Sequence, residues 1–376
     1  MTGASGVQNR KASVSSAPAT RSALVIDCGS VFTRVALLDL VDGRHRLLAM
    51  STVPTTSTPP YADVLQGIHA AIAELERLTA RSLLREGQVL TPEQESGDGV
   101  DAVALTVSVG GPLRLLTTGS GRDALAALVY RATTGFFTAL EPLAQEASPT
   151  SASGAYDAWE TQVAQQRSRP PHAVLVVGPS REGQRARPDM SETARVLAAW
   201  TAAMRAQEGE PRPEIPVLFT GMPADGAMLQ HALADQAHVQ MMEPLSPTAL
   251  APLSQAVATL YANAVVRAIP GYAGLRGLNS SFPVAATTAL GEAVRLLGQH
   301  YSMNVVGVDA GASATVLVGA SAQGGVLTAI QPAAGVGPGA GAVLRAAGAA
   351  SVLRWLPDTV EEAELREYVL KRMLRP

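Results

Sequence analysis

The sequence predicts a mixed α/β protein built from two related halves with an inserted α/β segment between them. Two motifs of the same plan, each an apolar run that ends in Asp-x-Gly, lie 282 residues apart at Asp27 and Asp309. An amphipathic helix pattern follows the first motif, and alternating strand and helix patterns lie between the two. Alternation of this kind is typical of a parallel α/β layer.

The composition excludes several classes of function. The chain has 376 residues and a formal net charge of -3, which argues against the basic face that a nucleic-acid-binding protein needs. Its two lysines, Lys11 and Lys371, lie near the ends of the chain and outside any Gly-x-x-x-x-Gly-Lys motif. A Walker-type phosphate loop and a Schiff-base lysine are therefore excluded. The single cysteine, Cys28, rules out an intrachain disulfide and suits a cytoplasmic location.

The N-terminus and the longest uncharged stretch bear on targeting. Residues 1–22 are rich in Ser, Ala and Thr and lack the apolar run of a signal peptide, so we expect a disordered tail. Residues 244–266 carry no charge but include three prolines and several polar side chains. This pattern favours a core helix over residues 252–269 rather than a membrane span.

We assign residues 23–118 to the first half. Apolar runs bounded by Gly and Asp predict strands over 23–27, 33–40 and 46–53. Apolar residues three and four apart predict a helix over 62–84. A buried strand over 102–109 and a further extended segment over 113–117 complete this part.

We assign residues 119–243 to an inserted βαβα subdomain and 244–376 to the second half. The insertion is predicted to hold the following elements: a helix over 123–143, a polar segment over 146–171, strands over 172–178 and 215–221, and helices over 191–207 and 224–237. The second half repeats the opening, with strands over 305–309 and 313–320, followed by helices over 340–349 and 361–374. We expect this half to be incomplete.

The two Asp-x-Gly motifs are candidate phosphate sites. A turn directly after a strand exposes backbone N–H groups, and glycine lets an anion approach them. We expect Asp27 and Asp309 to be the catalytic carboxylates, which hold Mg²⁺ or orient a water molecule. The residues predicted to bind the cofactor are Gly29, Ser30, Thr33, Arg34, Gly311, Ser313 and Thr315. The alternative is that these turns only close β-hairpins.

Such a pair of hairpins, one in each half and facing one cleft, resembles the phosphate loops of actin-like ATPases, which have duplicated ribonuclease H-like βββαβα cores. Longer segments resemble the glutamate mutase L family, and together they cover about residues 23–376. The matching segments are Ile26–Leu40, Ala173–Gly178, Pro216–Gly221, Ile269–Ala273, Asn304–Ser313 and Leu353–Pro357.

The resemblance implies an ATP-binding, chaperone-like helper or reactivating protein for an adenosylcobalamin-dependent mutase such as glutamate mutase. Its cofactors would be ATP and Mg²⁺, and its partner would be a protein, with no nucleic acid and no membrane span of its own. ATPase activity and a homo-oligomer both stay open.

Departures from the family pattern keep an alternative open. Ala312 stands where the family's second loop usually has glycine, and Val316 stands where it has an acidic or polar residue. Residues 333–341 are glycine-rich where relatives have Asp-Leu-Gly, and no later Gly-Gly adenosine loop is found. These features favour a degenerate, non-hydrolysing actin-like scaffold of a pilus-assembly or cell-division type. A small-molecule kinase is a third reading, but we find no candidate substrate base.

Overall fold

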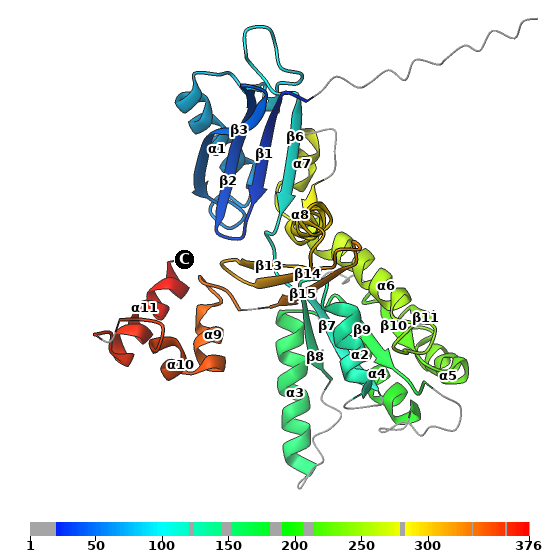
Figure 1. The fold of residues 1–376 in the computed structure, drawn as a ribbon. Helices are drawn as coiled ribbons and strands as arrows, with labels where there is room; N and C mark the ends of the chain where they lie inside the picture. The colour runs from blue at the N-terminus through cyan, green and yellow to red at the C-terminus, as the bar shows by residue number, and fades with distance from the viewer. Residues whose placement is uncertain are drawn as a thin grey trace, which may run out of the picture.

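The computed structural model describes most of the chain, and its strands form two five-stranded sheets, a three-stranded sheet and a two-stranded hairpin (Figure 1). The described residues are 20–119, 124–143, 152–180, 190–205, 214–278, 283–332, 334–357 and 359–375. Most of the disordered tail predicted for residues 1–22 lies outside these ranges.

The first sheet has the strand order β12-β6-β1-β2-β3. Its strands are β1 (Ser22–Cys28), β2 (Phe32–Val41), β3 (Arg44–Pro54), β6 (Ala102–Val107) and β12 (Val284–Ala285). The first three form an antiparallel meander, as predicted, and β6 runs parallel to both β1 and β12. Leu24, Ile26 and Cys28 are fully buried whereas the residues between them are partly exposed, so one face of the sheet forms a core.

Helix α1 (Val64–Thr79) covers that face. Ile68, Ile72 and Leu75 are fully buried in the same core as β1 and β2. The helix confirms the predicted amphipathic segment but ends earlier, because Ala80 takes a left-handed conformation with φ 55°. A small hairpin of β4 (Leu84–Arg85) and β5 (Gln88–Val89) follows. A second helix, α7 (Tyr272–Leu278), packs into this core.

The parallel sheet has the order β11-β10-β9-β7-β8. Its strands are β7 (Leu113–Gly119), β8 (Thr138–Pro142), β9 (Ala173–Val177), β10 (Val217–Thr220) and β11 (Val239–Met242). Numbered along the chain, this order is 2-1-3-4-5, that of a doubly wound α/β sheet. All five residues of β9 are buried, as expected of a strand with helices on both sides.

Helices cover both faces of the parallel sheet. One face is covered by α2 (Ala124–Thr133), by α6 (Ala251–Tyr261) and by the π-helix η1 (Ala262–Val266) that continues α6. The other face is covered by α3 (Ala152–Ser168), α4 (Met190–Arg205) and α5 (Pro223–Leu233). The predicted parallel layer is therefore present, with five described strands instead of two.

Three expectations for this region were wrong in part. The segment over 113–117, which we placed with the first half, hydrogen-bonds as β7 with β8 and β9. The helix predicted over 123–143 ends at Thr133, and β8 follows it in parallel with β7. The polar segment contains α3, which is anchored where Trp200 Nε1 donates a 2.6 Å hydrogen bond to Gln166 Oε1.

The small sheet lies between the two large ones (Figure 1). It consists of the antiparallel strands β13 (Val305–Ala310), β14 (Thr315–Ala320) and β15 (Val326–Gln331). On one face, Val294 of helix α8 (Ala286–Tyr301) packs in a core with Val316 and Val318. On the other face, Val306 and Leu327 are 74% and 72% exposed.

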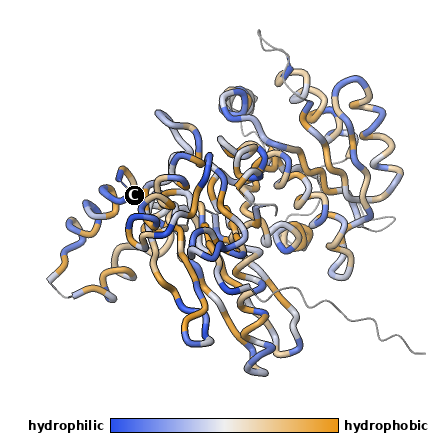
Figure 2. The backbone as a smooth tube through the Cα atoms, turned by 90° about the horizontal axis from the view of Figure 1, so that it is seen from above, coloured by the Kyte–Doolittle hydropathy of each residue, from blue (hydrophilic) through white to orange (hydrophobic). Residues whose placement is uncertain are grey.

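The C-terminal helices form a group beside the small sheet (Figure 1). They are α9 (Ala340–Ala347), α10 (Ala349–Leu353) and α11 (Glu362–Leu374), and they contact one another. The chain near the C-terminus shows mixed hydrophilic and hydrophobic colouring in Figure 2. Within the described ranges, no helix is both long and apolar enough to cross a lipid bilayer.

Candidate functional site

The two Asp-x-Gly motifs form hairpins with the same strand register. In the first hairpin (β1–β2), Asp27 pairs with Arg34. In the second hairpin (β13–β14), Asp309 pairs with Val316. Each residue of the second hairpin therefore occupies the place of the residue 282 positions earlier in the first.

The turns of the two hairpins share a backbone hydrogen bond. The N–H of Gly29 donates to the carbonyl of Phe32 at 3.0 Å, and the N–H of Gly311 donates to the carbonyl of Ala314 at 3.0 Å. A Cβ atom built on Gly29 would lie 2.7 Å from its acceptor oxygen, and one on Gly311 would lie 3.0 Å from its own. This close approach requires glycine in the first turn and makes a side chain at Gly311 a tight fit.

The two hairpins meet, and the space between them is a cavity of about 520 Å³, which we call the hairpin cavity. Ser313 Oγ donates a hydrogen bond of 3.0 Å to Ser30 Oγ across the junction. Seven of the nine predicted site residues line the cavity: Asp27, Gly29, Ser30, Arg34, Asp309, Gly311 and Ser313.

Thr33 and Thr315, which we expected to bind phosphate, do not line the cavity. Thr33 is fully buried, and its Oγ1 lies 3.0 Å from Thr55 Oγ1. Thr315 Oγ1 donates a 2.6 Å hydrogen bond to the carbonyl of Ala334. The Thr33 hydroxyl therefore fixes the segment that follows β3, and the Thr315 hydroxyl fixes the segment that follows β15.

The two carboxylates have different surroundings. Asp27 accepts a 2.9 Å hydrogen bond from Thr106 Oγ1 and lies 3.7 Å from Arg34 Nη1. Asp309 is exposed, and its carboxylate has no ion-pair or hydrogen-bond partner among the described residues. The second carboxylate is thus free to take a ligand.

The first turn also holds the buried Cys28. Burial raises the pKa of its thiol to about 11, so the thiol stays protonated near neutral pH. A protonated, buried thiol is a poor nucleophile and a poor metal ligand. We therefore interpret Cys28 as a small apolar residue that packs in the core at the end of β1.

Sequence reasoning missed the N-terminus of α8, which opens onto the hairpin cavity. Ala285, Ala286 and Thr287 line the cavity, and Ala285 is the N-cap residue but provides no side-chain hydrogen bond. The first N–H groups of a helix have no partner within the helix and carry partial positive charge. This end of the 16-residue helix therefore favours an anion in the cavity.

The sequence predicts a helix over 361–374, but it does not predict that α11 reaches the hairpin cavity. Tyr368 and Arg372 line the hairpin cavity. One feature of the sequence distinguishes Arg372 from the neighbouring cations of this helix. Arg366 and Lys371 each follow a glutamate by four residues, whereas Arg372 follows Tyr368 at that spacing.

The carboxylates of the cavity suit a magnesium ion that is bound together with phosphate. No group of three or more His, Cys, Asp or Glu side chains gathers as a metal site within the described ranges. Mg²⁺ is commonly held by only one or two carboxylates, with phosphate oxygens and water as the other ligands. Asp27 and Asp309 line a cavity that also holds hydrogen-bond donors for phosphate, so they fit that pattern.

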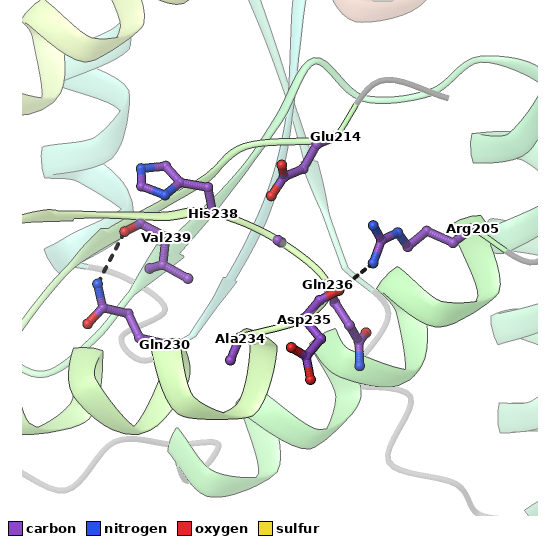
Figure 3. A pocket seen from close by; sticks show the side chains of 9 residues that line it. Arg205, Glu214, Gln230, Ala234, Asp235, Gln236, His238 and Val239 are labelled. Atoms are coloured by element: carbon purple, nitrogen blue, oxygen red, sulfur yellow. Dashed lines mark hydrogen bonds between the residues drawn. The ribbon is translucent and has the colours of Figure 1, made fainter. Parts of the chain in front are cut away.

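A second cavity of about 460 Å³ lies beside α5 and β11 and is drawn in Figure 3. Glu214, Asp235 and Arg205 line it, and Arg205 Nη1 donates a 2.7 Å hydrogen bond to the carbonyl of Asp235. None of the predicted site residues lines this cavity. The hairpin cavity, which seven of the predicted site residues line, is therefore the candidate site.

The fold and the site define a mixed α/β protein with two matching hairpins around one cavity. The model of the MutL protein family matches residues 23–376. The chain therefore belongs to this family, which confirms the resemblance to glutamate mutase L. A comparison with curated proteins found no match.

Two solved structures are similar to this chain. A diol dehydratase-reactivating factor in nucleotide-free form is 13% identical, with 59% of this chain and 30% of that chain covered and a TM-score of 0.15. An activator of 2-hydroxyisocaproyl-CoA dehydratase from Clostridium difficile with bound ADPNP is 10% identical, with 64% and 94% covered and a TM-score of 0.14. This chain thus spans less than a third of the reactivating factor, and we base no argument on similarities of this size.

Proposed function

We propose that the hairpin cavity binds ATP with Mg²⁺ and that the protein is a nucleotide-dependent helper of a partner enzyme. One observation carries the proposal: two hairpins of identical register, each with an aspartate at the strand end and a glycine turn, line the same cavity. Turns with exposed N–H groups bind phosphate, and paired aspartates hold the cation that accompanies it.

We further propose that the protein has a duplicated, actin-like fold. The first sheet, followed by α1, has the meander, helix and parallel strands of one half. The meander β13-β14-β15 would begin the second half. Its sheet has three strands in the described part of the chain, whereas the sheet of the first half has five. The parallel sheet would be an insertion between β6 and β12. On this proposal the first half includes β12, so it draws on residues from both sides of the insertion.

The proposed roles follow from the positions of the residues. Asp27 and Asp309 would hold Mg²⁺, and Asp309 would orient the attacking water if hydrolysis occurs. The turns at Gly29 and Gly311 would let a phosphate group approach closely, and the hydroxyls of Ser30 and Ser313 and the α8 N-terminus would bind its oxygens. Arg34 would balance charge, in the place where other phosphate sites use lysine.

We propose an adenosylcobalamin-dependent mutase, such as glutamate mutase, as the partner. Membership of the MutL family supports this choice. Nucleotide exchange or hydrolysis at a junction between two halves can drive their opening and closing. A movement of this kind would let the protein act on a partner enzyme rather than on a metabolite.

Calorimetric titration of the full chain with Mg·ATP tests the nucleotide site. We expect saturable binding with one site per chain. Absence of binding by the folded protein would refute the proposal. Added to an inactivated cobalamin mutase, the protein with Mg·ATP should restore turnover, whereas the protein alone should not.

A non-hydrolysing scaffold is the second candidate. The second hairpin favours it because Val316 lies opposite Asp309, where the first hairpin has an arginine. This scaffold would bind Mg·ATP without releasing phosphate. A phosphate-release assay on nucleotide-saturated protein, with and without the mutase, separates the two functions.

A further inference from the structure

Helix α11 contributes a cation to the hairpin cavity from outside the two hairpins. Tyr368 and Arg372 line the cavity and lie on one face of the helix because they are four residues apart. Arg372 Nε donates a 3.1 Å hydrogen bond to the Tyr368 hydroxyl, and its guanidinium carbon lies 5.5 Å from the ring centre. The tyrosine therefore orients the arginine and leaves four of its five N–H donors for other partners.

Arg372 differs from the neighbouring cations of α11 in having no acidic partner. Arg366 Nη2 lies 2.6 Å from Glu362 Oε1, and Lys371 Nζ lies 2.6 Å from Glu367 Oε1. No described carboxylate forms an ion pair with Arg372. Its charge is therefore free to attract an anion.

The position of α11 is tied to the second hairpin by a chain of contacts. The N–H groups of Val336 and Gly337 donate to the carbonyls of Gly311 and Ala312 at 3.0 and 2.9 Å. These residues lead into α9, in which Gly341 lies so close to Met373 of α11 that a Cβ on Gly341 would be 2.5 Å from its Sδ. The turn that faces the cavity thus also fixes the helix that carries Arg372.

The second hairpin itself provides no cation. In the first hairpin Arg34 lies opposite Asp27, whereas in the second a valine lies opposite Asp309. A bound triphosphate would carry several negative charges, and arginine binds phosphate through paired N–H groups. We propose that Arg372 of α11 contacts the phosphates of a nucleotide in the hairpin cavity and supplies the positive charge that the second hairpin lacks. This inference rests on the proposed nucleotide site.

Calorimetry on the full chain tests the contact, with Mg·ATP and adenosine as ligands. R372Q should weaken Mg·ATP binding about 10- to 100-fold, the range of a charge-assisted hydrogen bond. It should leave adenosine affinity within about twofold of the wild type, because adenosine has no phosphate. R372K should lose less than R372Q, since it keeps the charge but not the planar fork.

R366Q is the matched control, because Arg366 lies on the same helix, is exposed and does not line the cavity. It should bind Mg·ATP like the wild type. Wild-type affinity in R372Q, or an equal loss for adenosine, would overturn the inference while the nucleotide site stands. If the wild-type chain itself binds no Mg·ATP, the nucleotide site and this inference both fall. If R372Q does not fold, R372K becomes the test. Wild-type affinity of R372K for both Mg·ATP and adenosine would refute a paired contact between Arg372 and the phosphates.

Discussion

Ser313 Oγ and Ser30 Oγ, 283 residues apart in the chain, are joined by a 3.0 Å hydrogen bond. The two hydroxyls belong to equivalent hairpins that otherwise contribute to separate sheets. Both side chains line the hairpin cavity, and their bond links the two parts of the molecule that a nucleotide would have to bridge.

A double-mutant cycle on S30A and S313A measures that link. We expect a coupling free energy of about 1 kcal/mol, the usual net value for an uncharged hydrogen bond. Urea unfolding of the wild type, both single variants and the double variant gives the coupling. Additive effects would mean that the two hydroxyls do not interact in solution.

Each carboxylate of the cavity can be tested for cation binding. D27N and D309N should each weaken Mg·ATP binding about 10-fold or more, because a neutral amide is a poorer Mg²⁺ ligand. Binding of metal-free ATP should be unchanged or tighter, because a negative charge near the phosphates is removed. Titrations with Mg²⁺ and with a chelator separate the two effects. D42N, in the exposed β2–β3 turn, is the control and should bind like the wild type.

Gly335 is predicted to be intolerant of a side chain. A Cβ at this position would overlap the carbonyl of Ala312 in the second turn, and backbone cannot move aside as a flexible side chain can. G335A should lower the free energy of unfolding by about 1–3 kcal/mol. G319A is the control, because a Cβ there meets no atom within 4 Å, and it should cost less than 1 kcal/mol. Equal effects of the two substitutions would contradict the contact.

Because the Cys28 thiol is buried, we predict that the protein loses stability in alkali. The folded thiol has a pKa of about 11 against an ordinary value of 9.0, so between these pH values the unfolded chain loses the proton while the folded chain keeps it. Stability should therefore fall as pH rises from about 9 to 11, by at most about 1.4 kcal/mol per pH unit. Melting temperatures of the wild type and C28A across this range test it, and an identical pH slope in the two proteins would contradict the prediction.

The local part of the site could be predicted from the sequence. A strand, an aspartate, a glycine and a return strand follow one another within eight residues, so the hairpins at Asp27 and Asp309 depend on few distant contacts. The side-chain directions of Thr33 and Thr315 could not be predicted, because they depend on Thr55 and Ala334 beyond the hairpins.

The distant part of the site could not be predicted in the same way. The α8 N-terminus and Arg372 reach the cavity through the packing of segments that are far from the first hairpin in sequence. The strand β8 was mistaken for helix because its five residues, Thr-Ala-Leu-Glu-Pro, are too few to show a clear period, and only its pairing with β7 identifies it. The helix α3 was missed because its sequence is mostly polar and few of its described side chains are buried.

The shared register of the two hairpins gives the molecule an internal comparison. One chain holds two copies of the same turn, one with a guanidinium opposite its aspartate and one with a valine there. R34V would remove the guanidinium from the first copy and leave a valine opposite both aspartates. A comparison of R34V with the wild type would therefore measure, under one set of solution conditions and without a second protein as reference, how much the guanidinium beside Asp27 adds to ligand affinity.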